Sequence, residues 1–328
     1  MEYTTLGKTG VMVSRLCFGT MSFGNTSDEA ESRRVFARCL DHGITFFDCA
    51  NGYAKGEAER ILGRAMKGVR DDLVITTKVA SSVGAGHNDR GLSRRHIRQQ
   101  VERSLERLGT DRIDVYFVHK FDPHTPIEET LRALDDLVRD GRVLYLGVSN
   151  WAAWQIALAL GISRAEALAR FEVVQPMYNL VKRQAEVEIL PLAAAQGLGV
   201  TPYAPLAAGL LTGKYGLEKR PERGRIVDTD KYARRYGESW YYRTAQAFVA
   251  HAASRGVHPA SLAVAWVMSH PAVTAPILGA RSVEQLEASL GASALELTPA
   301  WRAEITALSV DPPPATDRNE DRVRPGGA

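Results

Sequence analysis

The chain has 328 residues, of which 45% are hydrophobic and 24% charged, with a formal net charge of +3 at pH 7. This composition is ordinary for a soluble globular enzyme, and the length suffices for one large domain or two ordinary ones. The basic residues are scattered and no apolar run approaches membrane-spanning length, so we expect neither a nucleic-acid partner nor a membrane.

The amino terminus and the cysteines bear on the compartment. Residues 1–6 lack the basic start and apolar core of a signal peptide. Cys17, Cys39 and Cys49 show no pairing pattern, and we interpret them as small apolar packing residues in a reducing setting. We therefore expect a cytoplasmic protein.

Short β-rich runs recur along the chain, and a polar side chain follows nearly every one. After a small hairpin at residues 6–11, the expected strands cover residues 15–20, 44–48, 73–77, 113–118, 143–148, 171–174, 199–202 and 273–278. The polar groups at their carboxyl ends are Asp48, Lys78, His119, Ser149 with Asn150, Gln175, Tyr203 and Arg281. Helical segments lie between most of the runs, which predicts parallel strands.

Two architectures compete for this pattern. A doubly wound sheet would carry a dinucleotide fingerprint, but no strand is followed by Gly-x-Gly-x-x-Gly at a helix start. The pattern therefore predicts an α/β fold of the (β/α)₈ TIM-barrel type with an N-terminal β-hairpin and two extra helices. We expect a single barrel domain over residues 1–310, including a long excursion at 206–239, and a C-terminal tail over 311–328. In a barrel the polar strand ends converge on one mouth.

Four of the converging residues suit carbonyl reduction. Taken alone, Asp48 is better explained as a turn cap, Lys78 as a solvated lysine and His119 as a satisfied histidine. Together, Lys78 can lower the pKa of the Tyr53 phenol, Asp48 can keep Lys78 charged, and His119 can donate to a carbonyl oxygen. Such a group can polarise an aldehyde or ketone and protonate the alkoxide, but a nicotinamide cofactor must supply the hydride.

The other strand ends suit that cofactor. Ser149, Asn150 and Gln175 offer groups for a carboxamide, and Tyr203 offers a ring face for nicotinamide. The segment 206–214 can place backbone N–H groups and the Lys214 ammonium along a pyrophosphate. Arg281, beside a helix start capped by Ser282, suits a 2′-phosphate and favours NADPH over NADH. Gly19 allows the backbone to approach either a ligand or a neighbouring strand.

At these residues the sequence resembles the aldo-keto reductase superfamily, in its bacterial-type branch, over nearly the whole chain. The matching stretches are Phe18-Gly19-Thr20-Met21, Phe47-Asp48 through Tyr53, Thr77-Lys78, Val118-His119, Gly147-Val148-Ser149-Asn150, Gln175 with Tyr178-Asn179, and Gly209-Leu210-Leu211-Thr212-Gly213-Lys214. The resemblance implies NADPH-dependent reduction of an aldehyde or ketone. It also implies Tyr53 as general acid, Asp48 and Lys78 as its tuning pair, and His119 as the donor that orients the carbonyl.

With the resemblance included, the expected cofactor contacts are Gly19, Thr20, Met21, Asp48, Ser149, Asn150, Gln175, Tyr203, Pro205, Leu206, Gly209, Leu211, Lys214, Gly279, Arg281, Gln285 and Ser289. The chain departs from many family members where Lys-Ser and a downstream arginine bind the 2′-phosphate, because the matching positions are Gly279-Ala280 and Gln285. NADP dependence is expected, with dual specificity left open.

The residues expected to line the substrate pocket are Phe23, Tyr53, His119, Phe121 and Trp151. We expect no metal, because no carboxylate or thiol cluster completes a site around His119 and His124. An apolar or aromatic carbonyl fits such walls, and a sugar aldehyde stays open. The rival function is a cofactor-holding regulatory subunit of the potassium-channel β type. The sequence leaves the oligomeric state open.

Overall fold

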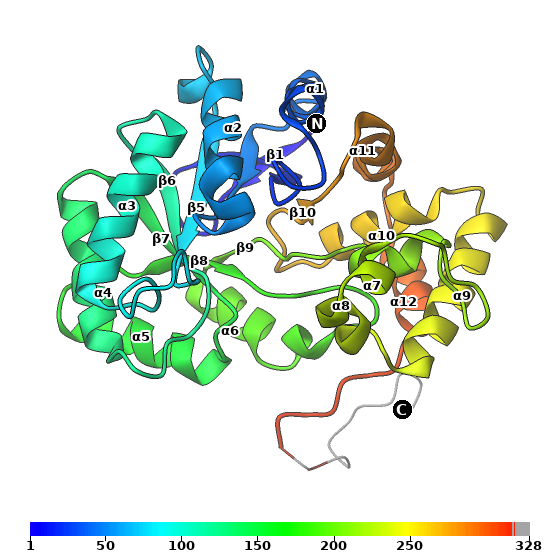
Figure 1. The fold of residues 1–328 in the computed structure, drawn as a ribbon. Helices are drawn as coiled ribbons and strands as arrows, with labels where there is room; N and C mark the ends of the chain where they lie inside the picture. Colours follow the sequence, from blue (N-terminus) through cyan, green and yellow to red (C-terminus); the bar gives the residue numbers. More distant parts are fainter. Residues whose placement is uncertain (317, 319–328) are drawn as a thin grey trace.

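A computed structural model describes residues 1–316 and residue 318, and its centre is an eight-stranded sheet (Figure 1). The strands are β3 (Cys17–Gly19), β4 (Phe46–Asp48), β5 (Val74–Val79), β6 (Ile113–Val118), β7 (Val143–Ser149), β8 (Phe171–Gln175), β9 (Gly199–Val200) and β10 (Ile277–Leu278). Their order is β10-β3-β4-β5-β6-β7-β8-β9, and each paired neighbour is parallel.

Hydrogen bonds between the two end strands close the sheet. The Ile277 N–H donates to the Pro202 carbonyl at 2.9 Å, and the Thr274 N–H donates to the Val200 carbonyl at 2.9 Å. The predicted (β/α)₈ barrel is confirmed. β9 and β10 are shorter than the predicted runs 199–202 and 273–278, because Pro202 and Pro276 have no N–H for a ladder.

Helices cover the outside of the barrel (Figure 1). The longer ones are α1 (Glu29–Asp41), α2 (Glu57–Ala65), α3 (Arg94–Leu108), α4 (Ile127–Arg139), α5 (Ala153–Ala165), α6 (Ile189–Gln196), α9 (Ser239–Ser254), α10 (Pro259–Met268), α11 (Val283–Leu290) and α12 (Pro299–Thr306). Capping sets several boundaries: Asp28 accepts from the Glu31 N–H at the start of α1, and α3 ends at left-handed Gly109.

The excursion at 206–239 contains short helices that the sequence did not predict. They are the 3₁₀ segment η4 (Ala207–Thr212), α7 (Arg225–Asp228) and α8 (Asp230–Arg235). None is long enough to produce a clear periodic apolar face, which is why charge and glycine content predicted only a loop.

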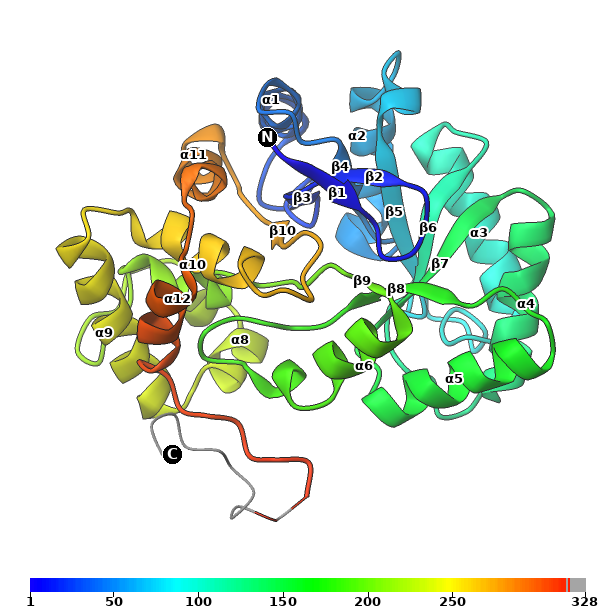
Figure 2. The ribbon, with the colours of Figure 1, turned by 180° about the vertical axis from the view of Figure 1, so that it is seen from behind.

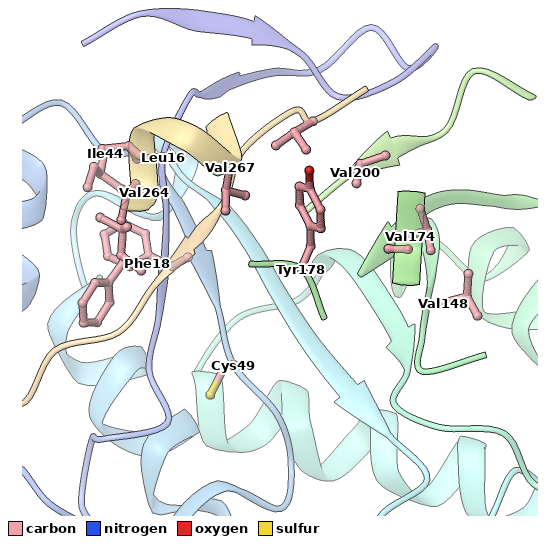
Figure 3. Packing of buried hydrophobic residues seen from close by; sticks show 14 of the residues in the cluster. Leu16, Phe18, Ile44, Cys49, Val148, Val174, Tyr178, Val200, Val264 and Val267 are labelled. Carbon is pink, nitrogen blue, oxygen red and sulfur yellow. The ribbon is translucent and has the colours of Figure 1, made fainter. Parts of the chain in front are cut away.

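The core has two layers because strand side chains alternate between the two faces of the sheet. One cluster lies between the strands and the helices, and Figure 3 shows members from β3 (Phe18), β8 (Val174) and α10 (Val264). A second, smaller cluster fills the barrel interior and joins Cys17, Phe46, Val115, Phe117 and Val173 to Leu6 of the hairpin. This interior layer is apolar toward the amino-terminal ends of the strands.

The hairpin of β1 (Tyr3–Thr5) and β2 (Met12–Ser14) covers that amino-terminal end (Figure 2). Leu6, in its connection, is 0% exposed and belongs to the interior cluster. The Lys8 N–H donates to the Gly197 carbonyl, just before β9, at 3.0 Å. With this end plugged, the polar interior positions lie at the opposite, carboxyl-terminal end.

The end of the chain is described only in part. Asp311, at the start of the predicted tail 311–328, accepts a hydrogen bond from Arg183 at 2.9 Å. Residues 317 and 319–328 of that tail lie outside the described residues. Within the described part of the chain, no helix is long and apolar enough to cross a membrane, and no group of three His, Cys, Asp or Glu could hold a metal ion.

Candidate active site

The centre of the site is a fully buried lysine held by a carboxylate. Lys78, on β5, is 0% exposed, and its Nζ lies 2.5 Å from Oδ2 of Asp48 at the end of β4. Lys78 Nζ also donates to the Cys49 carbonyl at 2.7 Å. The second Asp48 oxygen accepts from Thr76 Oγ1 at 2.8 Å and from Gln175 Nε2 at 2.9 Å. Each charge is thus compensated, as a buried ion pair requires.

Electrostatics keep Lys78 in its ammonium form. Burial lowers the pKa of Lys78, but the Asp48 carboxylate and Tyr53 outweigh it, and the net pKa lies above its ordinary value. A permanent cation therefore sits at the mouth of the barrel. The prediction that Asp48 keeps Lys78 charged agrees with this balance.

Tyr53 lies directly over that cation. The Lys78 Nζ is 5.2 Å from the centroid of the Tyr53 ring. Burial raises the pKa of Tyr53 to about 12, while the Lys78 charge acts in the lowering direction. The contribution expected of Lys78 is present, but burial outweighs it, so the net pKa does not fall below the ordinary value near 10 as expected. The phenol is a protonated group at neutral pH.

His119 completes the group as a neutral imidazole. Its ring lies edge-on to Tyr53 with the centroids 6.0 Å apart. Burial lowers the pKa of His119 to about 3, and the charges of Lys78, Lys231 and Lys120 act in the same direction. Nδ1 is buried without a hydrogen-bond partner among the described residues. A neutral ring keeps one N–H, which can donate to a carbonyl oxygen.

The neighbouring strand ends form a hydrogen-bonded chain that leads away from His119. Asn150 Nδ2 donates to the His119 carbonyl and to Ser149 Oγ, each at 2.9 Å, and the Tyr203 hydroxyl donates to Asn150 Oδ1 at 2.7 Å. Ser149 Oγ donates to the Gln175 carbonyl at 2.9 Å. The structure thus brings the predicted carboxamide-binding residues and Tyr203 together beside the quartet of Asp48, Tyr53, Lys78 and His119.

Backbone strain is concentrated at this end of the barrel. Among the described residues, eight other than glycine have positive φ, and seven of them follow strand ends: Ala54, Lys55, Ala80, Asn150, Ala204, Ala207 and Ala208. A left-handed backbone costs roughly 1–2 kcal/mol for such residues. It persists where the surrounding structure holds it, and it clusters at functional sites.

Beyond Tyr203, cations gather without carboxylate partners. Burial lowers the pKa of Lys214, and the charges of Arg281 and Arg225 lower it further. The Asp228 carboxylate acts in the opposite direction and raises it. None of these three cations has a carboxylate within 4 Å in the part of the chain that the structure describes. An anionic ligand would relieve this repulsion. Arg225 was not predicted, because no sequence pattern distinguishes it in the charged excursion.

Comparison with known proteins shows the family to which the chain belongs. The Aldo/keto reductase family matches residues 15–310. The chain belongs to this family. It is 40% identical over 299 residues to a probable voltage-gated potassium channel subunit beta of Arabidopsis thaliana, covering 89% of this chain and 91% of that protein.

Two bacterial relatives are named as enzymes. The uncharacterized oxidoreductase YrpG of Bacillus subtilis is 39% identical over 312 residues, covering 90% of this chain and 92% of that protein. The aldo-keto reductase YhdN of the same organism is 35% identical over 295 residues, covering 88% and 87%. Relatives of this chain therefore carry both oxidoreductase and channel-subunit names.

Other residues predicted to contact the cofactor lie at the end of β3 and just after it. A Cβ at Gly19 would lie 2.7 Å from Ile277 Cγ2, so this glycine serves the approach of β10. Thr20 is buried, and its N–H and hydroxyl both donate to the Asp48 carbonyl. Met21, which follows, is half-buried.

The segment after Tyr203 and the start of α11 hold the remaining predicted contacts. Gly279 and Gln285 are exposed and Leu206 is half-buried, whereas Pro205, Leu211 and Ser289 are buried. Gln285 Oε1 accepts from the Arg281 N–H at 3.2 Å. Leu211 is 0% exposed and lies in the core, so it faces no open site in this structure.

Only some of the residues predicted to line the substrate pocket lie near one another in the structure. Phe121 lies against Trp151, with ring centroids 5.1 Å apart, beside the strand end that carries His119. Trp151 also lines a cavity of about 190 Å³ with Asn150 and Met177. Phe23 is 0% exposed and packs against Phe18 in the core, so it faces no open pocket in this structure. Its position after a short strand did not reveal that burial.

Sequence reasoning missed Thr76, which donates to Asp48 inside the barrel. The strand pattern held the information, because Thr76 and Lys78 are two residues apart on β5 and share a face. The hydrogen bond from Lys78 Nζ to the Cys49 carbonyl could not be predicted, because every residue carries a backbone carbonyl. Burial raises the pKa of the Cys49 thiol, which is consistent with a packing residue.

Proposed function

We propose that this aldo/keto reductase uses NADPH to reduce an aldehyde or ketone to the alcohol, with Tyr53 as the general acid. The observation that carries the proposal is the buried Lys78 ammonium, 2.5 Å from the Asp48 carboxylate and 5.2 Å from the centroid of the Tyr53 ring. A phenol, a cation and a neutral imidazole at one barrel mouth form a donor set for an oxygen that gains negative charge.

A bound NADPH would supply the hydride for the carbonyl carbon, so the residues of this chain need only bind, orient and protonate. Tyr53 gives its proton to the carbonyl oxygen, and the Lys78 ammonium stabilises the phenolate that remains. His119 donates a hydrogen bond to the same oxygen and fixes its position. Solvent then returns a proton to Tyr53.

The residues present fit NADP(H). The amides of Asn150 and Gln175 and the ring of Tyr203 lie next to the quartet, as a nicotinamide ring with its carboxamide would require. Lys214, Arg225 and Arg281 gather farther along, where phosphates would lie. A helix start at Ser282 adds partial positive charge.

The Tyr53→Phe variant tests the proton donor. We expect kcat for an aromatic aldehyde to fall roughly 10²–10⁴-fold, the range that general acids contribute, with NADPH binding unchanged by fluorescence titration. Tyr116→Phe is the matched control, because the Tyr116 hydroxyl is buried and has no hydrogen-bond partner among the described residues. Normal turnover by Tyr53→Phe would reject the assignment.

A cofactor-holding regulatory subunit is the second candidate, because the 40% identical plant relative is named a probable potassium channel subunit beta. The two functions separate in one assay. The unaltered protein is mixed with NADPH and a broad carbonyl panel, and absorbance at the nicotinamide band is followed. Bound NADPH without turnover of any carbonyl would favour the subunit function and reject the reductase.

A further inference from the structure

The Tyr53 phenol sits on a strained loop that needs external support. Tyr53 begins a 3₁₀ segment, and the next residues Ala54, Lys55 and Gly56 have φ of 47°, 55° and 92°. Consecutive left-handed residues are unfavourable for ordinary side chains, and they persist only where neighbours over-determine them. The site itself offers little support, because the phenol must stay free to meet a substrate.

A buried carboxylate joins this loop to the strand that carries Lys78. Glu59, on the first turn of α2, is 0% exposed. Its Oε1 accepts from Thr77 Oγ1 at 2.6 Å, and its Oε2 accepts from Arg107 Nε at 2.6 Å. Thr77 directly precedes Lys78 and points outward, whereas Lys78 points into the barrel. Glu59 thus fixes α2 to the backbone that carries the lysine.

Helix α3 holds the loop at both ends. Arg107, which pairs with Glu59, lies against Gly56, where an added Cβ would be 2.9 Å from Arg107 Cδ. About two turns earlier on the same face of α3, the Gln100 side chain accepts from Asn51 Nδ2 at 3.0 Å. The Asn51 N–H in turn donates to the Lys78 carbonyl at 3.2 Å. Both ends of the Tyr53 loop are therefore tied to α3 and to β5.

We propose that Glu59 is a positioning residue that sets the distance between Tyr53 and Lys78 through Thr77 and Arg107. The proposal rests on the proposed reductase function for its catalytic consequence. A misplacement of about 1 Å in a reacting group can cost about 10²-fold in rate. Loss of the Glu59 contacts should therefore lower kcat while leaving the distant phosphate contacts, and so the KM for NADPH, unchanged.

The test compares Glu59→Gln with Asp114→Asn, which removes a comparable carboxylate from the pair between Asp114 and Arg70. That pair is also largely buried, at 2.7 Å, but it lies at the amino-terminal ends of β5 and β6. Both variants should lose stability. We expect only Glu59→Gln to lower kcat, by about tenfold or more, with an increased isotope effect from deuterated NADPH. Equal kcat in the two variants would overturn the proposal.

Thr77 supplies a gentler variant, in case Glu59→Gln does not fold. Thr77→Val removes one hydrogen bond and leaves the ion pair with Arg107 intact, whereas Thr77→Ser keeps the hydroxyl. We expect Thr77→Val to lower kcat severalfold at unchanged KM for NADPH, and Thr77→Ser to restore it. A loss in both variants, or in neither, would contradict a role for this hydroxyl.

A readout without turnover separates this proposal from the proposed function. The protein has 11 tyrosines, and the ¹⁹F resonance of fluorotyrosine at position 53 is assigned as the one missing in Tyr53→Phe. It should shift or broaden in Glu59→Gln and Thr77→Val, and stay in place in Asp114→Asn. An unmoved resonance in Glu59→Gln rejects the positioning role. A moved resonance in a protein without carbonyl turnover supports positioning and rejects the reductase.

Discussion

Tyr53 and His119 are both half-buried at the barrel mouth, and this burial favours the uncharged form of each side chain and shifts its pKa accordingly. The pKa of His119 falls to about 3 and that of Tyr53 rises to about 12. Lys78 differs because the Asp48 carboxylate compensates its burial. At physiological pH the site thus holds one cation, Lys78, and two neutral proton donors, Tyr53 and His119.

The lowered pKa of His119 predicts a pH dependence of stability. In the unfolded chain the imidazole takes up a proton below about pH 6.5, whereas in the folded chain it stays neutral down to about pH 3. Stability from this group is therefore complete above pH 6.5 and is lost as the pH falls toward 3. Relative to His119→Gln, the unaltered protein should lose ~2 kcal/mol of unfolding free energy between pH 7 and pH 5.

Urea titrations of the two proteins at each pH measure this difference. Parallel pH profiles for the unaltered protein and His119→Gln would show that the histidine titrates normally when folded. In that case the imidazole would become charged below about pH 6.5, and a neutral ring would face the carbonyl oxygen only above that pH.

The residue types and their strand-end positions were enough to predict the quartet, because parallel strands in a barrel end on one mouth. The net pKa of Tyr53 could not be predicted the same way. It depends on how much water the folded chain excludes, and the sequence shows only the neighbouring lysine. Phe23 was misplaced for the same reason, since its full burial follows from tertiary packing.

At the scale of elements, the segment after Tyr203 is shaped by its glycines. Gly209, in η4, has φ of +92°, and an added Cβ would lie 2.6 Å from Lys214 Cε. Gly68 has nearly the same φ, +89°, with nothing within 4 Å of an added Cβ. Comparing the alanine variants of these two glycines therefore separates the effect of backbone strain from the effect of displacing Lys214.

We therefore expect Gly209→Ala and Gly68→Ala each to cost about 1 kcal/mol of stability through their positive φ. Only Gly209→Ala should weaken NADPH binding, by roughly tenfold, because the new methyl group moves the Lys214 ammonium. Fluorescence titration with NADPH measures the effect. Equal affinities in the two variants would remove Lys214 from the phosphate contacts.

The sequence predicted the longer elements better than the short ones. In the sequence, a Ser93 cap and an apolar stripe predict a helix through Leu108, and a Ser282 cap predicts one over residues 283–290. α3 and α11 match these ranges. The short helices of the excursion were not predicted, and β9 and β10 were predicted too long, since tertiary contacts and proline positions define these elements.

At the scale of the molecule, the candidate active site and the apolar packing under the hairpin lie at opposite ends of the barrel. Leu6→Ala should lower the free energy of unfolding by about 2–5 kcal/mol, because the 0% exposed leucine fills the interior under the hairpin. Met12→Ala, on the same hairpin but 53% exposed, should change it by less than about 0.5 kcal/mol. Urea unfolding measures both values.

The kcat of Leu6→Ala should match that of the unaltered protein under conditions where both are folded. A lower kcat would show that packing at the plugged end reaches the reacting groups, and it would contradict the separation of the two ends.

The ring of strands has one weak join, where two-residue β9 and β10 meet. Every other neighbouring pair of barrel strands forms a ladder of paired residues. Between β9 and β10 the chain instead contains the whole excursion 206–239, with η4, α7 and α8, followed by α9 and α10. The residues proposed to bind the cofactor flank this join, with Tyr203 and Lys214 on one side and Arg281 on the other. A dinucleotide that contacts residues on both sides of this junction would also hold β9 and β10 together. Cofactor binding and closure of the barrel would then stabilise each other.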